Sequence, residues 1–385
     1  MDDASVIIIG AGIGGLTAGI ALTQAGYSVE IYDRVSELRP VGAGISLWSN
    51  GVKVLNALGL TRQMADIGGS MERMQYLSAT GTLLNDIDLQ PLVAQVGQCP
   101  YPVARADLQQ MLLDAFPGQV HLNAKCIGVD QTEDKAIAAF ADGRQATADI
   151  LIGADGIRST VREYVLEEAI APRYAGYVNV NGLVPASSEL ADARTWVIYV
   201  GDHKRASMMP VGGDRFYFFF DLPLPEAAPP HPDGVRAELE TAFAGWCQPV
   251  QNLIAAIAPD TANRLPIRDV GPLERFARGR VVLLGDAAHT TTPDLGQGGC
   301  QATEDAIVLA RCLKAHLSVT DALKQYEADR VPRTGKLVLK ARQRTDDIHG
   351  KDPAVTQKWY EQLASEPPEA VTGAIAKVIL GGPLH

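Results

Sequence analysis

The stretch Val6–Asp33 constrains the fold of this chain more than any other part of the sequence. The apolar run 6–9 predicts a strand buried on both faces, as in a parallel sheet. A helix is predicted over 14–25, and a second strand over 28–32 leads to Asp33. Strand, helix and strand in this order are typical of the opening unit of a Rossmann-like fold.

Glycines join the first strand to the helix. Gly10, Gly12 and Gly15 carry the spacing G-x-G-x-x-G, and Gly14 lies among them. Such glycines let the backbone approach a pyrophosphate, and the positive end of the helix stabilises its charge. A carboxylate about 20 residues further on, here Asp33, accepts ribose hydroxyls. The stretch predicts a dinucleotide site and leaves open whether the ligand is NAD or FAD.

Length, charge and cysteine usage narrow the class of protein. The chain of 385 residues exceeds the roughly 250–300 residues at which a single core stops growing, which predicts two domains. A net charge of −11 disfavours nucleic acid and anionic membranes as partners. Five cysteines without C-x-x-C spacing argue against a disulfide framework and a zinc site, so no metal is expected. With no leader and no apolar run of about 18 residues, a soluble cytoplasmic protein is expected.

The pattern changes along the chain. After a glycine-rich loop over 40–49, one helix is expected over 51–67 and another over 105–116. A strand is expected over 120–126, and from 177 to 221 short β-type runs are typical of an antiparallel sheet. The expected plan is a discontinuous nucleotide-binding domain over 1–72, 98–175 and 268–350, a substrate domain over 73–97 and 176–267, and a C-terminal helical segment over 351–385.

Two later glycine elements bear on the choice between NAD and FAD. Residues 153–156 read GADG, and a buried strand over 281–284 ends in Gly285 and Asp286. A second glycine turn, 296–299, opens a helix expected to begin near Cys300. The N–H groups at such a helix start stabilise negative charge on a flavin ring. NAD needs no second site of this kind, so the sequence favours FAD.

The three elements GAGIGG near the start, GADG at 153–156 and GDAAH…PDLGQG at 285–298 together resemble the motifs of the group A FAD-dependent aromatic hydroxylases. The resemblance covers essentially the whole chain. It implies an α/β fold like that of para-hydroxybenzoate hydroxylase, with a Rossmann-like FAD-binding domain and an interleaved antiparallel-sheet substrate part of α+β character. It also implies bound FAD and a transient NADH or NADPH, for which no second G-x-G-x-x-G unit is present.

This likeness implies cofactor contacts residue by residue. Asp33 stands where many members carry Glu, and the shorter carboxylate can still accept ribose hydroxyls. Asp155 would serve both FAD and NAD(P)H, and the backbone of Cys126 would touch adenine. His289 is either a base or, as we favour, a packed histidine beside the flavin. The implied cofactor set is Gly10, Gly12, Gly14, Gly15, Asp33, Arg34, Ser46, Arg105, Cys126, Asp155, Asp286, Gly296, Gln297, Gly298, Gly299 and Cys300.

The residues around Gly212–Asp214 predict one face of the substrate sheet. If these residues close a hairpin, Val211 pairs with Arg215, one face carries Arg205, Ser207, Met209, Tyr217, Phe219 and Asp221, and the other carries Phe216, Phe218 and Phe220. Arg205 could then bind a planar anion through paired N–H groups, with Tyr217 fixing its rotamer. The alternative is an Arg205–Asp221 cross-strand pair with Tyr217 as packing, and geometry alone does not decide between them.

Within this family, several segments resemble the bacterial FAD-dependent urate hydroxylases, namely PVGAGISLWSNGVK, RYAGYVNVNGLV, GDHKRASMMPV, RFYFFFD, TTPDLGQGGC and HGKD. This likeness implies urate as the substrate and favours a catalytic role for Arg205, Tyr217 and Asp294. Asp294 could instead only cap the turn before Gly296. The implied substrate contacts are Asn179, Arg205 and the backbone of Gln297, Gly298 and Gly299.

The implied reaction is hydroxylation of urate at C5 to 5-hydroxyisourate in purine catabolism. NADH would reduce FAD, O2 would add at flavin C4a, and the resulting hydroperoxide would transfer its terminal OH. The expected partners are urate, O2 and NADH, and a homodimer is one assembly that the sequence allows. Two rivals stay open: a hydroxylase of another planar aromatic acid, such as hydroxybenzoate, salicylate or hydroxynicotinate, and a non-catalytic flavin-binding redox sensor.

Overall fold

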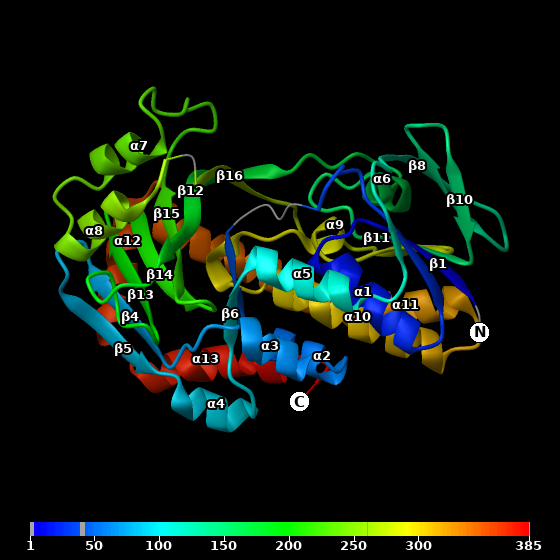
Figure 1. Ribbon diagram of the computed structural model, residues 1–385, viewed down its shortest axis with the longest axis horizontal. Helices are drawn as coiled ribbons and strands as arrows, with labels where there is room; N and C mark the ends of the chain where they lie inside the picture. Colours follow the sequence, from blue (N-terminus) through cyan, green and yellow to red (C-terminus); the bar gives the residue numbers. More distant parts are fainter. Residues whose placement is uncertain (1–3, 39–42, 260, 385) are drawn as a thin grey trace.

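The computed structural model describes residues 4–38, 43–259 and 261–384. Two large sheets lie toward opposite ends of the long axis of the molecule, with helices between them (Figure 1). One sheet contains the start of the chain, and the other contains its β-rich middle. The first residues of the expected glycine-rich loop, 40–42, lie outside the described residues.

The first sheet has six strands, in the order β17-β18-β11-β1-β2-β7. All neighbouring pairs are parallel except β17 with β18. Its central strands are continuous apolar runs because a parallel sheet is covered on both faces. The strands are β1 (Ser5–Ile9), β2 (Ser28–Tyr32), β7 (Gln119–His121), β11 (Ile150–Gly153), β17 (Ala277–Arg278) and β18 (Val281–Leu283).

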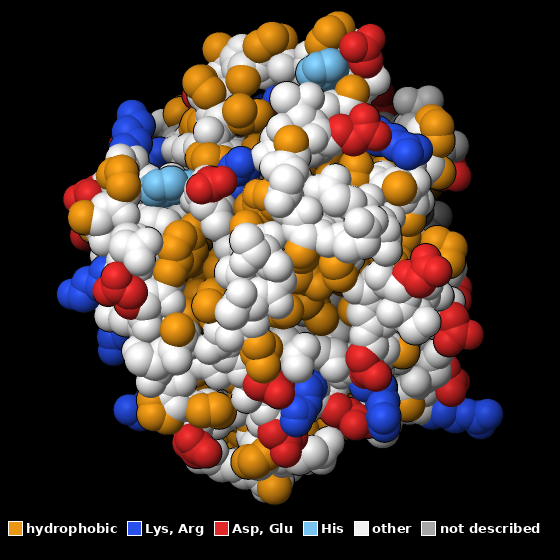
Figure 2. Space-filling view, turned by 90° about the vertical axis from the view of Figure 1, so that its left-hand side faces the viewer, with side chains coloured by type: hydrophobic (Ala, Val, Ile, Leu, Met, Phe, Trp, Pro, Cys, Tyr) orange, Lys and Arg blue, Asp and Glu red, His pale blue; other side chains and the backbone are white. Residues whose placement is uncertain are grey.

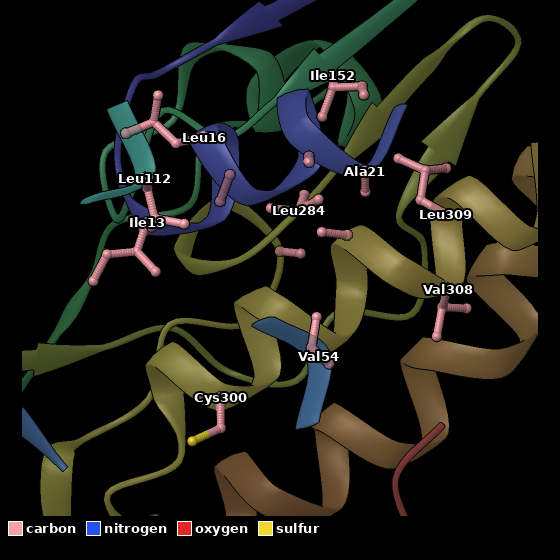
Figure 3. Close-up of a cluster of buried hydrophobic side chains, with 14 of the residues drawn as sticks. Ile13, Leu16, Ala21, Val54, Leu112, Ile152, Leu284, Cys300, Val308 and Leu309 are labelled. Carbon is pink, nitrogen blue, oxygen red and sulfur yellow. The ribbon is translucent and has the colours of Figure 1, made fainter. Parts of the chain in front are cut away.

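Helix α1 (Ile13–Gln24) packs against α10 (Gly298–Ala315), which begins two residues before the position expected from the sequence. The approach is close because small residues line it: a Cβ added to Gly14 would lie 3.2 Å from the Cβ of Ala302. Figure 3 shows side chains of α1, α10 and neighbouring segments converging on one apolar cluster. The packing brings the first glycine turn close to the start of α10.

The second sheet has seven strands, in the order β16-β12-β15-β14-β13-β4-β5. It is antiparallel as expected, except that β4 and β13 run parallel, because β13 reaches this edge by a long connection and not by a hairpin. The strands are β4 (Arg73–Ser78), β5 (Leu83–Asp88), β12 (Arg173–Pro185), β13 (Thr195–Gly201), β14 (Lys204–Val211), β15 (Arg215–Leu222) and β16 (Asn263–Asp269).

The predicted register of the β14–β15 hairpin is confirmed. Val211 pairs with Arg215, and Arg205 pairs with Asp221. The three phenylalanines of the far face are buried in a separate core with α7 (Val235–Ala242) and α8 (Gln248–Ala256). The opposite face of the hairpin, which carries Arg205, therefore looks away from that core.

Two expected elements are each divided. The helix expected over 51–67 is two helices, α2 (Ser49–Ala57) and α3 (Thr61–Ile67), because Gly59 takes a φ of +84° and ends α2. The strand expected over 120–126 is likewise split between β7 and β8 (Cys126–Gln131), with Asn123 at a φ of +55° between them. The smaller strands are β3 (Gly44–Leu47), which pairs with β6 (Tyr101–Ala104), and β8, β9 (Ala136–Phe140) and β10 (Gln145–Ala148).

The longest of the remaining helices lies in the last quarter of the chain. These helices are α4 (Gln90–Val96), α5 (Arg105–Ala115), α6 (Thr160–Leu166), α9 (Asp286–His289), the 3-10 helix η1 (Pro293–Leu295), α11 (Val319–His349), α12 (Pro353–Ser365) and α13 (Pro368–Leu380). In the part of the chain that the structure describes, none of the helices has the length and apolar character needed to cross a membrane. Figure 2 shows acidic and basic side chains scattered over the end that holds the second sheet.

Candidate functional site

The glycine turn before α1 contains two glycines required by packing and one that faces open space. Gly10 has a φ of +112°, and a Cβ there would overlap the carbonyl of Ala154. A Cβ on Gly15 would overlap the carbonyl of Gly10. Gly12, by contrast, has no heavy atom within 4 Å of its added Cβ. Space is therefore left at Gly12, beside the N-terminus of α1, where an anionic group is stabilised.

Asp33 supports this turn directly. Its Oδ2 accepts a hydrogen bond from the N–H of Ala11 at 2.7 Å, and its Oδ1 accepts one from the N–H of Val35 at 3.1 Å. The carboxylate therefore lies at the glycine turn, as the βαβ motif requires. Its contact with a ribose stays a prediction.

The start of α10 is the second candidate contact for a cofactor. Gly296 ends η1 with a φ of +61° and lies so close to Ser46 and Trp48 that no Cβ would fit. Gly298 and Gly299 form the first turn of α10, whose N–H groups have no partner within the helix. A Cβ on Gly298 would have only Thr291 within 4 Å. This side of the helix start is open to a ligand.

A buried ionic network holds α10 in place. Arg330 of α11 lies 2.8 Å from Glu304 and 2.6 Å from Asp305. Asn50 donates to Glu304 at 2.7 Å and to the Oε1 of Gln297 at 3.0 Å. The side chain of Gln297 is thus turned into the protein, which leaves only its backbone for the substrate contact predicted from the sequence.

The side chains of His289 and Cys300 are buried, and the cofactor contact of Cys300 stays a prediction. His289 is buried, with Nε2 2.6 Å from Asp305, in agreement with the packed histidine that the sequence favoured. Burial raises the pKa of the Cys300 thiol to about 12, so the thiol stays protonated at neutral pH. Among the described residues, no group of His, Cys, Asp and Glu could hold a metal ion.

Arg205 lies at the centre of a second buried cluster. Its Nε donates to Asp221 at 2.8 Å, and its Nη2 lies 2.7 Å from Asp221 and 2.6 Å from Asp294. Asp294 also accepts hydrogen bonds from Tyr177 at 2.9 Å and from Thr345 at 2.6 Å. Asp294 is therefore a buried partner of Arg205, and not only a cap of the turn before Gly296.

Electrostatics favour the charged forms of Arg205 and Asp294. Burial opposes the charge of Arg205, but Asp221 and Asp294 outweigh it and hold the pKa of Arg205 above its usual range. Burial likewise opposes ionisation of Asp294, but Arg205 and the hydrogen bonds from Thr345 and Tyr177 hold the pKa of Asp294 below its usual value. The cluster contains two carboxylates and one guanidinium.

The structure contains the Arg205–Asp221 pair that was one of the two alternatives. This pair occupies only the Nε and Nη2 atoms of the guanidinium. Nη1 of Arg205 has no hydrogen-bond partner within the described ranges, and it is not among their fully buried unpaired atoms. The ring of Tyr217 lies against Gly44, where a Cβ would overlap it, and burial raises the pKa of Tyr217. One edge of Arg205 is fixed by carboxylates, and the other is left for a ligand.

The predicted substrate contact Asn179 is part of the same cluster. Its Nδ2 donates to Asp221 at 2.7 Å, and its Oδ1 accepts from Asn181 at 2.7 Å. Asn181 in turn accepts from the N–H of Ala43, at the edge of the glycine-rich loop. Asn179 thus connects the Arg205 cluster to that loop, and its substrate contact stays a prediction.

The other predicted cofactor residues differ in their burial and hydrogen bonding. Asp155 accepts from Ser159 and from two N–H groups at the start of α6, so it caps that helix, and burial raises its pKa. Arg34 and Asp286 are exposed, and the half-buried side chain of Arg105 has no hydrogen-bond partner among the described residues. Cys126 is buried at the start of β8, where burial raises its pKa to about 11.

Sequence reasoning missed three polar residues of the Arg205 cluster: Tyr177, Thr345 and His349. Thr345 and Tyr177 are 51 and 117 positions from Asp294 in the chain. Local periodicity carries no information about such partners. Tyr177 and His349 do lie inside segments that resemble the urate hydroxylases, which was the one available signal.

The residues present fit a flavin dinucleotide. Gly12 leaves space beside a helix N-terminus, and the first turn of α10 offers a second set of free N–H groups. Asp294 lies two residues before Gly296, so the Arg205 cluster adjoins that second set. One site is suited to a pyrophosphate, and the other to an anionic ring edge beside a bound substrate.

Comparison with known proteins agrees with this geometry. The family model described as FAD binding domain matches residues 3–341. The FAD-dependent urate hydroxylase of Mycolicibacterium vanbaalenii is 49% identical, with 98% of this chain and 97% of that protein covered. The urate hydroxylase of Klebsiella pneumoniae is 46% identical, covering 98% of this chain and 99% of that protein.

A solved structure agrees over the same length. Klebsiella pneumoniae HpxO, complexed with FAD and uric acid, superposes with a TM-score of 0.95 at 44% identity, covering 99% of this chain and 98% of that one. The para-hydroxybenzoate-hydroxylase-like α/β fold and FAD as cofactor are thereby confirmed. The chain belongs to the FAD binding domain family of flavin-dependent monooxygenases.

Proposed function

We propose that this chain hydroxylates urate at C5 to 5-hydroxyisourate, with FAD as its bound cofactor. The observation that carries this proposal is the free Nη1 edge of Arg205, held by Asp221 and Asp294 next to the glycine turn that opens α10. The similarity to proteins named urate hydroxylase over nearly the whole chain supports the choice of urate.

The overall reaction balances with NADH as the electron donor. Urate, O2, NADH and one proton give 5-hydroxyisourate, NAD⁺ and water. A C–O bond forms at C5, the O–O bond breaks, and NADH supplies the two electrons that reduce the second oxygen atom to water. Bound FAD supplies the redox chemistry, because it accepts electrons from NADH and passes them to O2.

The residues of the chain supply binding and orientation. We assign Arg205 to bind the urate anion through Nη1, because an N–H bonded to an anion forms a strong, directional contact. Asp221 and Asp294 fix the guanidinium, and Tyr217 lies on the same face of the sheet. The N–H groups of Gly298 and Gly299 would stabilise negative charge at the flavin edge. We also propose a cytoplasmic location, which the five free cysteines support.

The test mixes the FAD-loaded protein with NADH and urate in air, and follows urate, NADH and H2O2 together. We expect urate and NADH to disappear in equal amounts with little H2O2. Parallel assays contain salicylate, 4-hydroxybenzoate or 6-hydroxynicotinate in place of urate. Stimulation of NADH oxidation by one of these acids, and not by urate, would reassign the substrate. No NADH turnover with any of them would favour the redox sensor.

A further inference from the structure

His349 is a buried histidine whose tautomer is set by its surroundings. It is the last residue of α11, and its Nδ1 lies 2.7 Å from the backbone carbonyl oxygen of His203, in the turn between β13 and β14. A carbonyl oxygen only accepts, so Nδ1 carries the proton of the neutral ring. The other ring nitrogen, Nε2, is then a lone-pair acceptor.

Nε2 of His349 faces the carboxylates that hold Arg205. It lies 3.7 Å from Oδ2 of Asp221 and 3.9 Å from Oδ1 of Asp294. It is fully buried and has no hydrogen-bond partner among the described residues. A buried polar atom without a partner is rare in folded proteins and calls for a functional explanation. Unprotonated Nε2 and the two carboxylate oxygens can all only accept hydrogen bonds. Nε2 can donate to a carboxylate only after it gains a proton.

The groups around the ring shift the pKa of His349 in opposite directions. Burial lowers the pKa of His349, the guanidinium of Arg205 lowers it further, and Asp221 and Asp294 raise it. Tyr177 of β12 stacks on the ring with a centroid distance of 4.2 Å. The net effect is a pKa of His349 below the usual value of histidine. The neutral ring therefore prevails at neutral pH while the site holds no further anion.

Two further titratable groups, His203 and Tyr360, lie near the His203 carbonyl that binds Nδ1 of His349. The Nδ1 of His203 lies 3.0 Å from the hydroxyl of Thr356 in α12. The hydroxyl of Tyr360 accepts from the N–H of His203 at 3.2 Å. These contacts tie the turn that carries the His203 carbonyl to α12.

We propose that His349 takes up a proton when an anionic substrate binds at Arg205. With His349 neutral, Asp221, Asp294 and Arg205 carry a net charge of −1 in a buried site, and a urate anion would make it −2. Protonation of Nε2 restores −1 and provides the donor that the two carboxylates lack. A shift of about 1 Å brings the carboxylates into hydrogen-bond range. Because adding an uncompensated buried charge is costly, the proton and the anion bind together.

His349 is thus a positioning residue, which acts on the substrate through Asp221, Asp294 and Arg205. The inference rests on the proposed function, since it places the urate anion at Arg205. It adds a proton-linked step that is separate from the redox chemistry. Its signature is proton uptake on binding alone, without NADH or turnover.

The test measures urate binding to the FAD-loaded protein between pH 6 and pH 9 by calorimetry, in two buffers with different ionisation enthalpies. For the natural protein we expect uptake of close to one proton per urate in the middle of this range, and a Kd that rises by up to tenfold per pH unit. His349→Asn keeps a donor for the His203 carbonyl but cannot titrate, so we expect its uptake to fall toward zero.

The matched control is His203→Asn. Position 203 has a φ of +60°, which Asn tolerates, and this variant keeps the backbone carbonyl that binds His349. We expect its proton uptake to equal that of the natural protein. Urate binding by the natural protein without proton uptake would overturn this inference and leave the proposed function standing, even if His349→Asn does not fold. Failure of urate to bind would overturn both.

Discussion

Arg205 illustrates how much one residue depends on its partners. Its charge is held between Asp221 and Asp294, and only the Nη1 edge is left for a ligand. Removing the guanidinium would take away the proposed ligand contact and also leave two buried carboxylates without their counterion. An experiment at this residue must therefore separate binding from stability.

We predict that Arg205→Met retains FAD but binds urate about 10- to 100-fold more weakly, because a hydrogen bond to a charged group contributes about 1.5–3 kcal/mol. NADH oxidation should then yield mainly H2O2, measured together with urate loss. The free energy of unfolding should fall by about 3–5 kcal/mol, as expected when one partner of a buried ion pair is removed.

The control for this variant is Arg264→Met. Arg264 makes a half-buried ion pair with Glu238, 2.9 Å apart, between β16 and α7. It belongs to no part of the Arg205 cluster, so urate binding should be unchanged. Unchanged urate affinity and full coupling in Arg205→Met would remove Arg205 from the substrate site.

At the first glycine turn, we predict opposite outcomes for two neighbouring glycines. Gly12→Val should fold, since its Cβ meets no atom and its φ of −78° suits any residue, but it should not retain FAD. Gly15→Val should fail to fold, because its Cβ would overlap the carbonyl of Gly10. Circular dichroism reports folding, and the flavin absorbance of the purified protein reports retention. A fully yellow Gly12→Val protein would contradict the assignment.

At the scale of elements, Asp149 fastens the start of β1 to the β10–β11 connection. Its Oδ2 accepts from the N–H of Ser5 at 2.8 Å, and its Oδ1 pairs with Lys135 at 2.8 Å. Burial opposes its ionisation, but the bonds to Lys135 and Ser5 outweigh burial and lower the pKa of Asp149 to about 2. A depressed pKa stabilises the fold above the unfolded value of about 3.9.

We therefore predict that Asp149→Asn is less stable than the natural protein at pH 7, and that the difference shrinks as the pH falls from 4 toward 2. The sign follows because the stabilisation is present above the unfolded pKa and is lost as the pH falls through the folded one. Urea denaturation at pH 7, 4 and 3 measures the difference. Asp130→Asn, at an exposed aspartate, is the control, and a difference that grew on acidification would refute the prediction.

Elements also show where prediction from sequence succeeds. The βαβ unit and the β14–β15 register followed from periods of 3.6 and 2 and from turn residues, which act over short distances. The prediction of a single helix over 51–67 was wrong. An isolated glycine is found both inside helices and at their ends, so the sequence did not show that Gly59 ends α2. The partners of Asp294 could not be predicted, since they come from strands and helices far apart in the chain.

At the scale of the whole molecule, the net charge of −11 should repel anionic NADH, the proposed electron donor. We predict that the KM for NADH falls about twofold to tenfold when the salt concentration rises from 10 to 150 mM, because the Debye length shrinks from about 30 to about 8 Å. The kcat should change little. Steady-state kinetics in NaCl measure both, and a KM that rose with salt would indicate capture by a local cationic patch.

The sharing of Asp294 between Arg205 and the turn before Gly296 has an evolutionary consequence. Asp221, Asp294 and Arg205 are each buried, so losing any one of them leaves an uncompensated charge in the interior. A lineage that changes its substrate from an anion to a neutral ring must therefore replace several of these residues together. We therefore expect substrate preference at this proposed site to be epistatic, so that libraries that vary one position at a time will rarely reach a new substrate.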